Sequence, residues 1–134
     1  MSRENLNLVR GAYEAWNRED LEWGLRHVGP EFELHPMRGF FDLEGVYRGK
    51  DGYRRFWTTW REAWESITIT VDRIEAIGRD RVRGQITFDA KGNESGADVS
   101  LKATHVFTIR NGRFARLETI PGWEAVDDSG PAKR

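Results

Sequence analysis

The chain has 134 residues, the length of one domain, and its 38% hydrophobic and 32% charged residues are typical of a globular protein with a single buried core. The formal net charge is −1 and no run of like charges occurs, which argues against nucleic acid or an anionic membrane as a partner. Cysteine is absent, and this excludes disulfides, thiol catalysis and thiolate metal ligands.

Helical periodicity opens the chain. Apolar side chains recur at intervals of three and four residues at Leu6, Val9, Tyr13 and Trp16. This spacing predicts an amphipathic helix over residues 3–17. Asp20 can cap a second, shorter helix that runs to about His27, where Gly29 and Pro30 end it.

A short strand and a third helix follow. Residues 31–35 alternate apolar and polar side chains as a strand does, and residues 46–48 can form a brief second strand. From Gly49 onward the helical spacing returns, and Asp51 can cap this third helix. Its predicted apolar face consists of Tyr53, Phe56, Trp57, Trp60 and Trp64.

In the second half of the chain, the period at which apolar side chains recur changes from 3.6 residues, as in a helix, to 2 residues, as in a strand. From Ser66 to Ile120 the alternation of apolar and polar side chains predicts four long antiparallel strands. The alternation slips near Asp72 and Arg73, where a bulge would re-aim the first of these strands. The dipeptide Asn111-Gly112 predicts a tight hairpin between the last two.

Helices in the N-terminal half and a strand meander in the C-terminal half predict an α+β domain. We expect a cone-shaped, curved antiparallel sheet that encloses a pocket together with three helices. The pattern shows no internal repeat and no linker, so we expect a single domain over residues 1–126. The polar segment 127–134 is predicted to be a disordered tail.

Three segments resemble the nuclear transport factor 2-like superfamily: AYEAWNREDLEW, which starts at Ala12, then VYRGKDGYRRFW and SGADVSLKATHVFTIRNGRFARLETI. Within that superfamily the chain is most similar to the SnoaL-like branch, named for a polyketide cyclase, over residues 3–125. The resemblance implies a cystatin-like cone with a deep apolar pocket, and a homodimer through the outer face of the sheet. Because members include isomerases, cyclases, dehydratases, epoxide hydrolases and non-catalytic binders, it implies no single reaction.

His35 is the first candidate catalytic residue. The pair His35-Pro36 stands where the ketosteroid isomerases of this superfamily carry Asp-Pro, whose aspartate moves protons between carbons. Imidazole has an ordinary pKa near 6.5, so a histidine could act there as a general base at the pocket wall. The alternative is a strand-end histidine bonded to backbone or solvent, because alternation places it opposite Phe32 and Leu34.

His105 is the second candidate. It shares strand parity with Ala103, Phe107 and Ile109, so it should point to the same apolar face. A polar ring on that face needs a hydrogen-bond partner. The isomerases carry at a similar position a protonated acid that stabilises an oxyanion, and the resemblance therefore implies a pocket-lining role. A satisfied core histidine is the alternative.

Tyr13 and Glu118 complete the candidate catalytic set. The oxyanion-binding tyrosine of the isomerases matches Ala12 rather than Tyr13, and one residue is about 100° around a helix. This departure weighs against ketosteroid isomerase chemistry, although the Tyr13 hydroxyl could still reach the pocket rather than pack in the core. Glu118 lies in phase with Phe114, near the region where SnoaL-type cyclases use an acid; a structural ion pair with Arg116 is the alternative.

Aromatic side chains are the expected ligand contacts, and the chain has six tryptophans. The candidates are Trp16, Phe40, Phe41, Trp57, Trp60 and Phe107, most of which could equally pack in the core. Phe40 and Phe41 follow Pro36 in a loop and could form a pocket lid or a dimer contact. We expect no metal, because the histidines lack paired spacing, and no nucleotide cofactor, because no glycine-rich phosphate loop occurs.

The sequence favours an enzyme that works without a cofactor on a small apolar carbonyl or polyketide-like compound. Such an isomerase, cyclase or hydrolase would transfer protons with His35 as base, while His105 or Tyr13 stabilised the enolate oxygen. A non-catalytic module that binds a small apolar ligand is the alternative, and a protein-interaction unit using the outer sheet face is a third hypothesis. The N-terminus lacks the apolar core of a signal peptide, so we expect a cytoplasmic protein.

Overall fold

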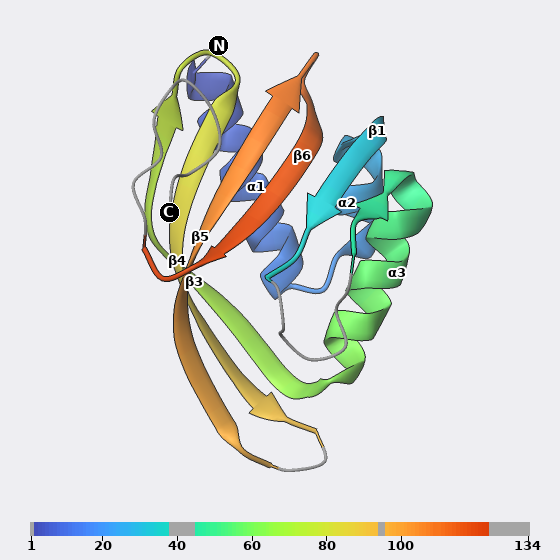
Figure 1. Cartoon of the computed structure of the whole chain (residues 1–134), viewed down its shortest axis with the longest axis vertical. Helices are drawn as coiled ribbons and strands as arrows, with labels where there is room; N and C mark the ends of the chain where they lie inside the picture. The colour runs from blue at the N-terminus through green and yellow to red at the C-terminus, as the bar shows by residue number, and fades with distance from the viewer. Residues whose placement is uncertain (1, 38–44, 94–95, 124–134) are drawn as a thin grey trace.

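The computed structural model describes residues 2–37, 45–93 and 96–123, which form an α+β fold (Figure 1). Its elements in chain order are α1 (Ser2–Asn17), α2 (Leu21–His27), β1 (Val28–His35), β2 (Tyr47–Arg48), α3 (Gly49–Glu62), β3 (Trp64–Ile77), β4 (Arg81–Gly92), β5 (Asp98–Arg110) and β6 (Arg113–Pro121). The predicted α+β class is therefore confirmed. No helix within the described ranges is long and apolar enough to cross a membrane.

All six strands belong to one sheet, in the order β2-β1-β6-β5-β4-β3. Strands β3 to β6 form the predicted antiparallel meander. Strand β1, however, pairs in parallel with β6, so the sheet is mixed rather than purely antiparallel. The prediction was wrong on this point because alternation identifies a strand but carries no information about its neighbour.

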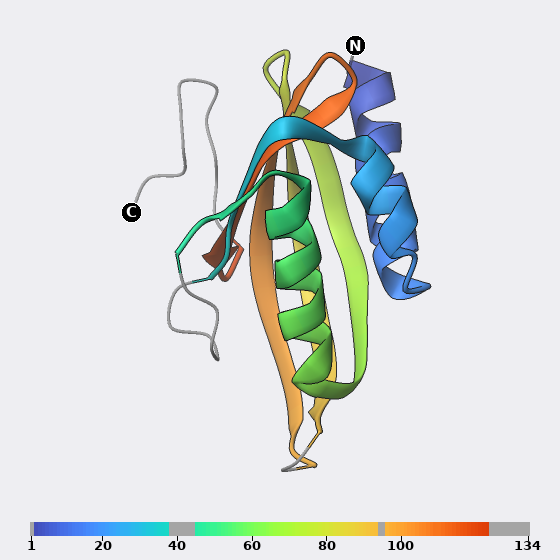
Figure 2. The same ribbon diagram turned by 90° about the vertical axis from the view of Figure 1, so that its right-hand side faces the viewer.

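Irregular pairing bends the sheet around its helices. The register between β3 and β4 shifts between Val71 and Arg73, which confirms the predicted bulge near Asp72. A second shift, between Thr108 and Ile109 of β5, leaves Ala115 of β6 without a paired residue. Figure 2 shows the result: α3 runs along one face of the curved sheet, and α1 lies alongside β3.

The helix boundaries confirm one predicted cap and correct another. Asp20 caps α2, and its Oδ1 accepts a hydrogen bond from the backbone N–H of Trp23 at 3.0 Å. The N-cap of α3 is Arg48, and Asp51 lies in the first helical turn. A carboxylate at that position still stabilises the helix, because it interacts favourably with the positive end of the helix dipole. The helix ends at Glu62, so Trp64 belongs to β3 rather than to the helix.

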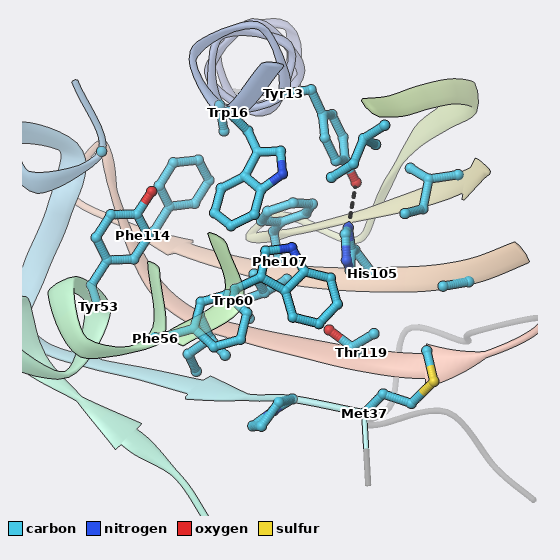
Figure 3. A pocket seen from close by; sticks show the side chains of 18 of the residues that line it. Tyr13, Trp16, Met37, Tyr53, Phe56, Trp60, His105, Phe107, Phe114 and Thr119 are labelled. Atoms are coloured by element: carbon cyan, nitrogen blue, oxygen red, sulfur yellow. Dashed lines mark hydrogen bonds between the residues drawn. The ribbon is translucent and has the colours of Figure 1, made fainter. Parts of the chain in front are cut away.

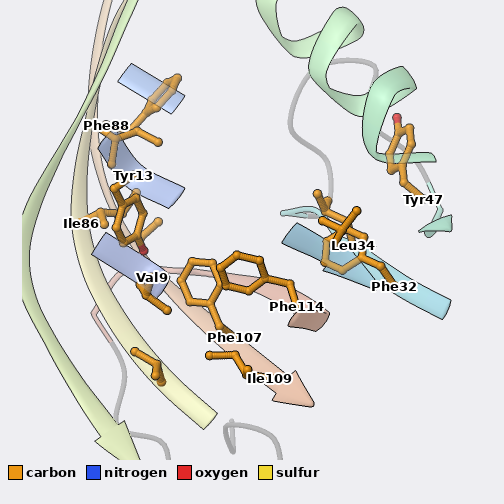
Figure 4. Packing of buried hydrophobic residues seen from close by; sticks show 14 of the residues in the cluster. Val9, Tyr13, Phe32, Leu34, Tyr47, Ile86, Phe88, Phe107, Ile109 and Phe114 are labelled. Atoms are coloured by element: carbon orange, nitrogen blue, oxygen red, sulfur yellow. The ribbon is translucent and has the colours of Figure 1, made fainter. Parts of the chain in front are cut away.

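The core lies on the concave face of the sheet. Figure 4 shows aromatic and aliphatic side chains from α1, β1, β4, β5 and β6 that point into this space. Val9, Leu34 and Val82 are almost completely buried. At the turn between β5 and β6, Asn111 and Gly112 adopt φ angles of 53° and 73°, which confirms the predicted tight hairpin.

Two polar contacts fix α1 over the sheet. The side-chain amide of Asn17 donates to the backbone oxygen of Ile69 at 2.8 Å and accepts from its N–H at 2.9 Å. The guanidinium of Arg61 on α3 donates to the backbone oxygen of Trp16 and lies 4.8 Å from the ring centroid of that tryptophan. These contacts hold the end of α1 against both β3 and α3.

We expect Asn17→Ala to lower the free energy of unfolding by about 1–2 kcal/mol, because the substitution removes both hydrogen bonds to Ile69. Urea denaturation measures the loss. Asn7→Ala is the matched control, since Asn7 lies exposed on the same helix and bonds only to Arg10 among the described residues. Equal losses in the two variants would show that the contact with Ile69 does not stabilise the fold.

Candidate functional site

A cavity of about 120 Å³ lies between the helices and the concave face of the sheet (Figure 3). This volume exceeds that of a single water site and suits a small organic molecule. Large apolar side chains form most of its wall, among them Trp16, Trp23, Phe56, Trp60, Phe107 and Phe114. Among the described residues, no Asp, Glu, Lys or Arg lines it.

Tyr13 and His105 form the main polar feature of this wall. The Tyr13 hydroxyl lies 2.8 Å from Nδ1 of His105, and the two rings stack with centroids 5.7 Å apart and an interplanar angle of 18°. Burial raises the pKa of Tyr13 well above its ordinary value. Burial also lowers the pKa of His105 to about 4. Both side chains are therefore neutral at pH 7.

The direction of this hydrogen bond follows from the partners available. The Tyr13 hydroxyl has Nδ1 of His105 as its partner among the described residues. If Nδ1 carried the proton, the phenol proton would have no acceptor, and leaving a buried donor unpaired costs about 1–3 kcal/mol. The phenol therefore donates to Nδ1, and Nε2 of His105 carries the ring proton. That Nε2–H has no acceptor among the described side chains and backbone groups.

His35 lies on the other face of the sheet. Phe32 and Leu34 line the cavity, so strand alternation turns His35 outward. There its Nε2 lies 3.0 Å from Oε1 of Glu33, whose second oxygen accepts a hydrogen bond from Arg48 at 2.5 Å. The hydrogen bond from His35 is the largest cause of the lowered pKa of the Glu33 carboxyl, and the hydrogen bond from Arg48 is the next largest. The structure does not bring the imidazoles of His35 and His105 to one cavity, as the general-base hypothesis requires.

Glu118 also faces away from the cavity. Leu117 and Thr119 of β6 line it, and Glu118 alternates with them on the outer face, in register with His35 of β1. The predicted phase with Phe114 is wrong because the unpaired Ala115 shifts the alternation by one residue.

The aromatic candidates divide into two groups. Trp16, Trp60 and Phe107 line the cavity, and their role as ligand contacts stays a prediction. Trp57 does not line it; it is 8% exposed and packs behind Trp16, with 4.6 Å between ring centroids. The predicted loop contacts Phe40 and Phe41 lie outside the described residues.

Several residues that line the cavity were not among the predicted ligand contacts. Tyr53 and Phe56 share a helical face with Trp60, and this spacing could have placed them beside it. The bulge in β6 reverses the face on which alternation predicts Thr119. The place of Trp23 in the wall depends on how α2 packs on the sheet, which local patterns do not predict. Within the described ranges, no group of three or more His, Asp or Glu is arranged to hold a metal ion.

Comparison with known protein families gives a match to the SnoaL-like domain over residues 9–117. The chain belongs to this family. The SnoaL-like chain is similar to a nuclear transport factor 2-like protein of unknown function from Burkholderia pseudomallei K96243, with 25% identity, a TM-score of 0.80, and coverage of 90% of this chain and 92% of that one.

Two further structures show the same fold. TerC, crystallised with polyporic acid, is 24% identical with a TM-score of 0.78, over 88% of this chain and 91% of that one. An LEH-like epoxide hydrolase of M. tuberculosis is 21% identical with a TM-score of 0.68, over 88% of this chain and 82% of that one. No curated protein matches the chain. These similarities show the nuclear transport factor 2-like fold and leave the reaction open.

We expect the stability of the protein to fall as the pH is lowered from about 6.5 to about 4. Because the pKa of His105 is about 4 in the folded state and near 6.5 in the unfolded state, the unfolded chain takes up a proton that the folded chain resists. Tyr13, Phe107 and Thr119 surround the ring, and none of them carries a compensating charge. Neutral His105 makes its full contribution to the free energy of unfolding above pH 6.5. Loss of this contribution on acidification lowers that free energy by at most about 3 kcal/mol.

Urea denaturation at pH 7 and pH 4.5 tests this prediction against His105→Asn. Asparagine can still accept from the Tyr13 hydroxyl but does not titrate, so its stability should fall less between the two pH values. Carboxylates such as Glu33 titrate in both proteins, so their effects on the free energy of unfolding cancel when the two proteins are compared. The same fall in both proteins would mean that His105 does not resist protonation.

Proposed function

We propose that this SnoaL-like protein binds a small, apolar molecule that carries an oxygen acceptor such as a carbonyl group. One observation carries the proposal: an apolar, largely aromatic cavity contains the neutral Tyr13–His105 pair, whose Nε2–H has no acceptor among the described residues. The apolar wall supplies affinity, about 25 cal/mol for each Å² removed from water. The Nε2–H of His105 can fix the orientation of the ligand.

The absence of charged groups among the described lining residues favours a neutral ligand. A carboxylate or phosphate would lose its hydration without gaining a cation, which costs much more than burying a carbonyl that receives a hydrogen bond. TerC, which shares this fold, was crystallised with polyporic acid, and this supports a small-molecule ligand for a protein of this architecture. The homodimer and the cytoplasmic location stay predictions from the sequence.

We expect 2-acetylnaphthalene to bind the cavity and to quench the fluorescence of the tryptophans that line it, Trp16, Trp23 and Trp60. The matched hydrocarbon 2-ethylnaphthalene should bind about tenfold more weakly, because it cannot accept the hydrogen bond from His105. Fluorescence titration measures both dissociation constants.

Two alanine-to-phenylalanine variants locate the bound probe. Ala103 lines the cavity and is 2% exposed, so Ala103→Phe should fill the space and abolish saturable quenching. The control Ala97→Phe, at an exposed position outside the cavity wall, should bind the ketone like the wild type. Circular dichroism establishes that both variants fold. Undiminished binding by folded Ala103→Phe would place the probe elsewhere and refute the proposal.

Catalysis by proton transfer is the second candidate function, and the Tyr13–His105 pair is the observation that favours it. An Nε2–H bonded to a carbonyl oxygen would stabilise the negative charge of an enolate. The described wall holds no carboxylate base, however, and a histidine with a pKa of about 4 is a weak base at pH 7. The geometry therefore supports binding ahead of catalysis.

Deuterium exchange separates the two functions. The α-hydrogens of 2-tetralone exchange in D2O through the enolate, and NMR follows their loss. For a binding protein we expect the exchange rate to equal that in buffer, and His35→Ala should leave it unchanged because His35 faces away from the cavity. Acceleration that disappears in His105→Asn would instead establish the enzyme, with His105 as a catalytic residue.

A further inference from the structure

We infer that Gly84 is a positioning residue of the cavity: its missing side chain makes room for the Tyr13 hydroxyl, which holds the His105 ring with Nε2–H free for a ligand. The inference rests on the proposed function, because it concerns the donor that this function assigns to the ligand oxygen. It adds a residue from β4 to a pair formed by α1 and β5.

Gly84 lies directly opposite His105 in the antiparallel register of β4 and β5. Its neighbours in alternation, Val82 and Ile86, are 0% and 2% exposed and belong to the core, so Gly84 shares their inward-facing side of the strand. Gly84, the one residue without a side chain on this stretch of β4, is thus the cross-strand partner of His105.

Space, rather than backbone conformation, requires glycine at this position. Gly84 does not adopt a positive φ angle, so other residues could take its backbone conformation. A glycine inside a strand costs conformational entropy relative to alanine, which selects against it in the absence of another requirement. A Cβ at this position would lie 2.4 Å from the Tyr13 hydroxyl oxygen, a distance that real Cβ atoms essentially never show.

The conflict concerns the hydroxyl rather than the whole ring. The same Cβ would lie 3.3 Å from Cζ of Tyr13 and 3.5 Å from its Cε2, which are tight and ordinary contacts respectively. Tyr13 is only 4% exposed and packs edge-to-face on Phe107, so the phenol cannot swing away into solvent. Alanine at position 84 would therefore push the hydroxyl off Nδ1 of His105.

Loss of that contact changes what His105 presents to the cavity. The groups around the ring from the packed elements are Tyr13 of α1, Gly84 of β4, Phe107 of β5 and Thr119 of β6, and none is charged. The hydrogen bond from Tyr13 is thus the contact that specifies which nitrogen carries the proton. Without it, the ring can exchange tautomers and reorient, and the donor is no longer held toward the ligand oxygen.

A double-mutant cycle of Gly84→Ala and Tyr13→Phe tests the steric part of the inference without any ligand. We expect Gly84→Ala to lower the urea midpoint when Tyr13 is present. In the Tyr13→Phe background the same change should leave the midpoint unchanged or raise it, because the conflicting oxygen is gone and alanine suits a strand better. An equal fall in both backgrounds would overturn the inference.

Imidazole ¹⁵N NMR reports the part of the inference that concerns His105. In the wild type we expect one tautomer, with Nε2 protonated and Nδ1 accepting a hydrogen bond. Gly84→Ala should move the Nδ1 signal toward that of a free imidazole nitrogen. The control Gln85→Ala, at the next residue on the opposite face of β4, should leave the signal in place. An unchanged Nδ1 signal in folded Gly84→Ala would overturn the positioning role.

The ligand measurement connects the inference to the proposed function. In Gly84→Ala the preference for 2-acetylnaphthalene over 2-ethylnaphthalene should fall about threefold or more, the low end of what one hydrogen bond contributes. An unchanged preference would overturn the link to ligand binding. If the wild type binds neither probe, the proposed function fails, whereas the mutant cycle and the NMR signal still decide the role of Gly84.

Discussion

The hydrogen bond between Tyr13 and His105 joins the first helix to the fifth strand across an apolar interior. Either group alone would be costly there, because a buried polar atom without a partner loses its hydration and gains nothing in return. The bond therefore helps to hold α1 over the sheet. Asn17 and Arg61 hold the end of that helix, and Gly84 leaves the space in which the phenol lies.

This arrangement gives the SnoaL-like chain a cavity whose described wall is nearly uniform in chemistry. Aromatic rings form most of this wall, and the neutral Tyr13–His105 pair adds a hydrogen-bonding group to it. The interacting charged groups Glu33 and Arg48 lie on the other face of the sheet, together with His35. Because no charged side chain lines the described wall, the proposed function assigns ligand recognition to shape and to hydrogen bonds with neutral groups.

Local sequence patterns predicted the helices, the strands, the Asp72 bulge and the Asn111-Gly112 turn, because each depends on residues that are close in the chain. They did not predict the parallel pairing of β1 with β6, which joins segments about 80 residues apart. They also placed Glu118 on the wrong face, because the unpaired Ala115 inverts the alternation after it and the change of phase between Phe114 and Leu117 was not interpreted as a bulge. Parity placed His105 on the cavity face, whereas its contact with Tyr13 required the packing of α1 on the sheet.

The amide of Asn17 has a further consequence for the molecule in a crowded solution. Strand β3 forms the outer margin of the sheet, and such a margin offers unpaired backbone groups to which a strand from another molecule can add. At Ile69 both of these groups are already bonded to Asn17, and the kink at Asp72 interrupts the flat template that strand addition needs. The Asn17 side chain thus occupies both backbone groups of Ile69 that an added strand would need at this point.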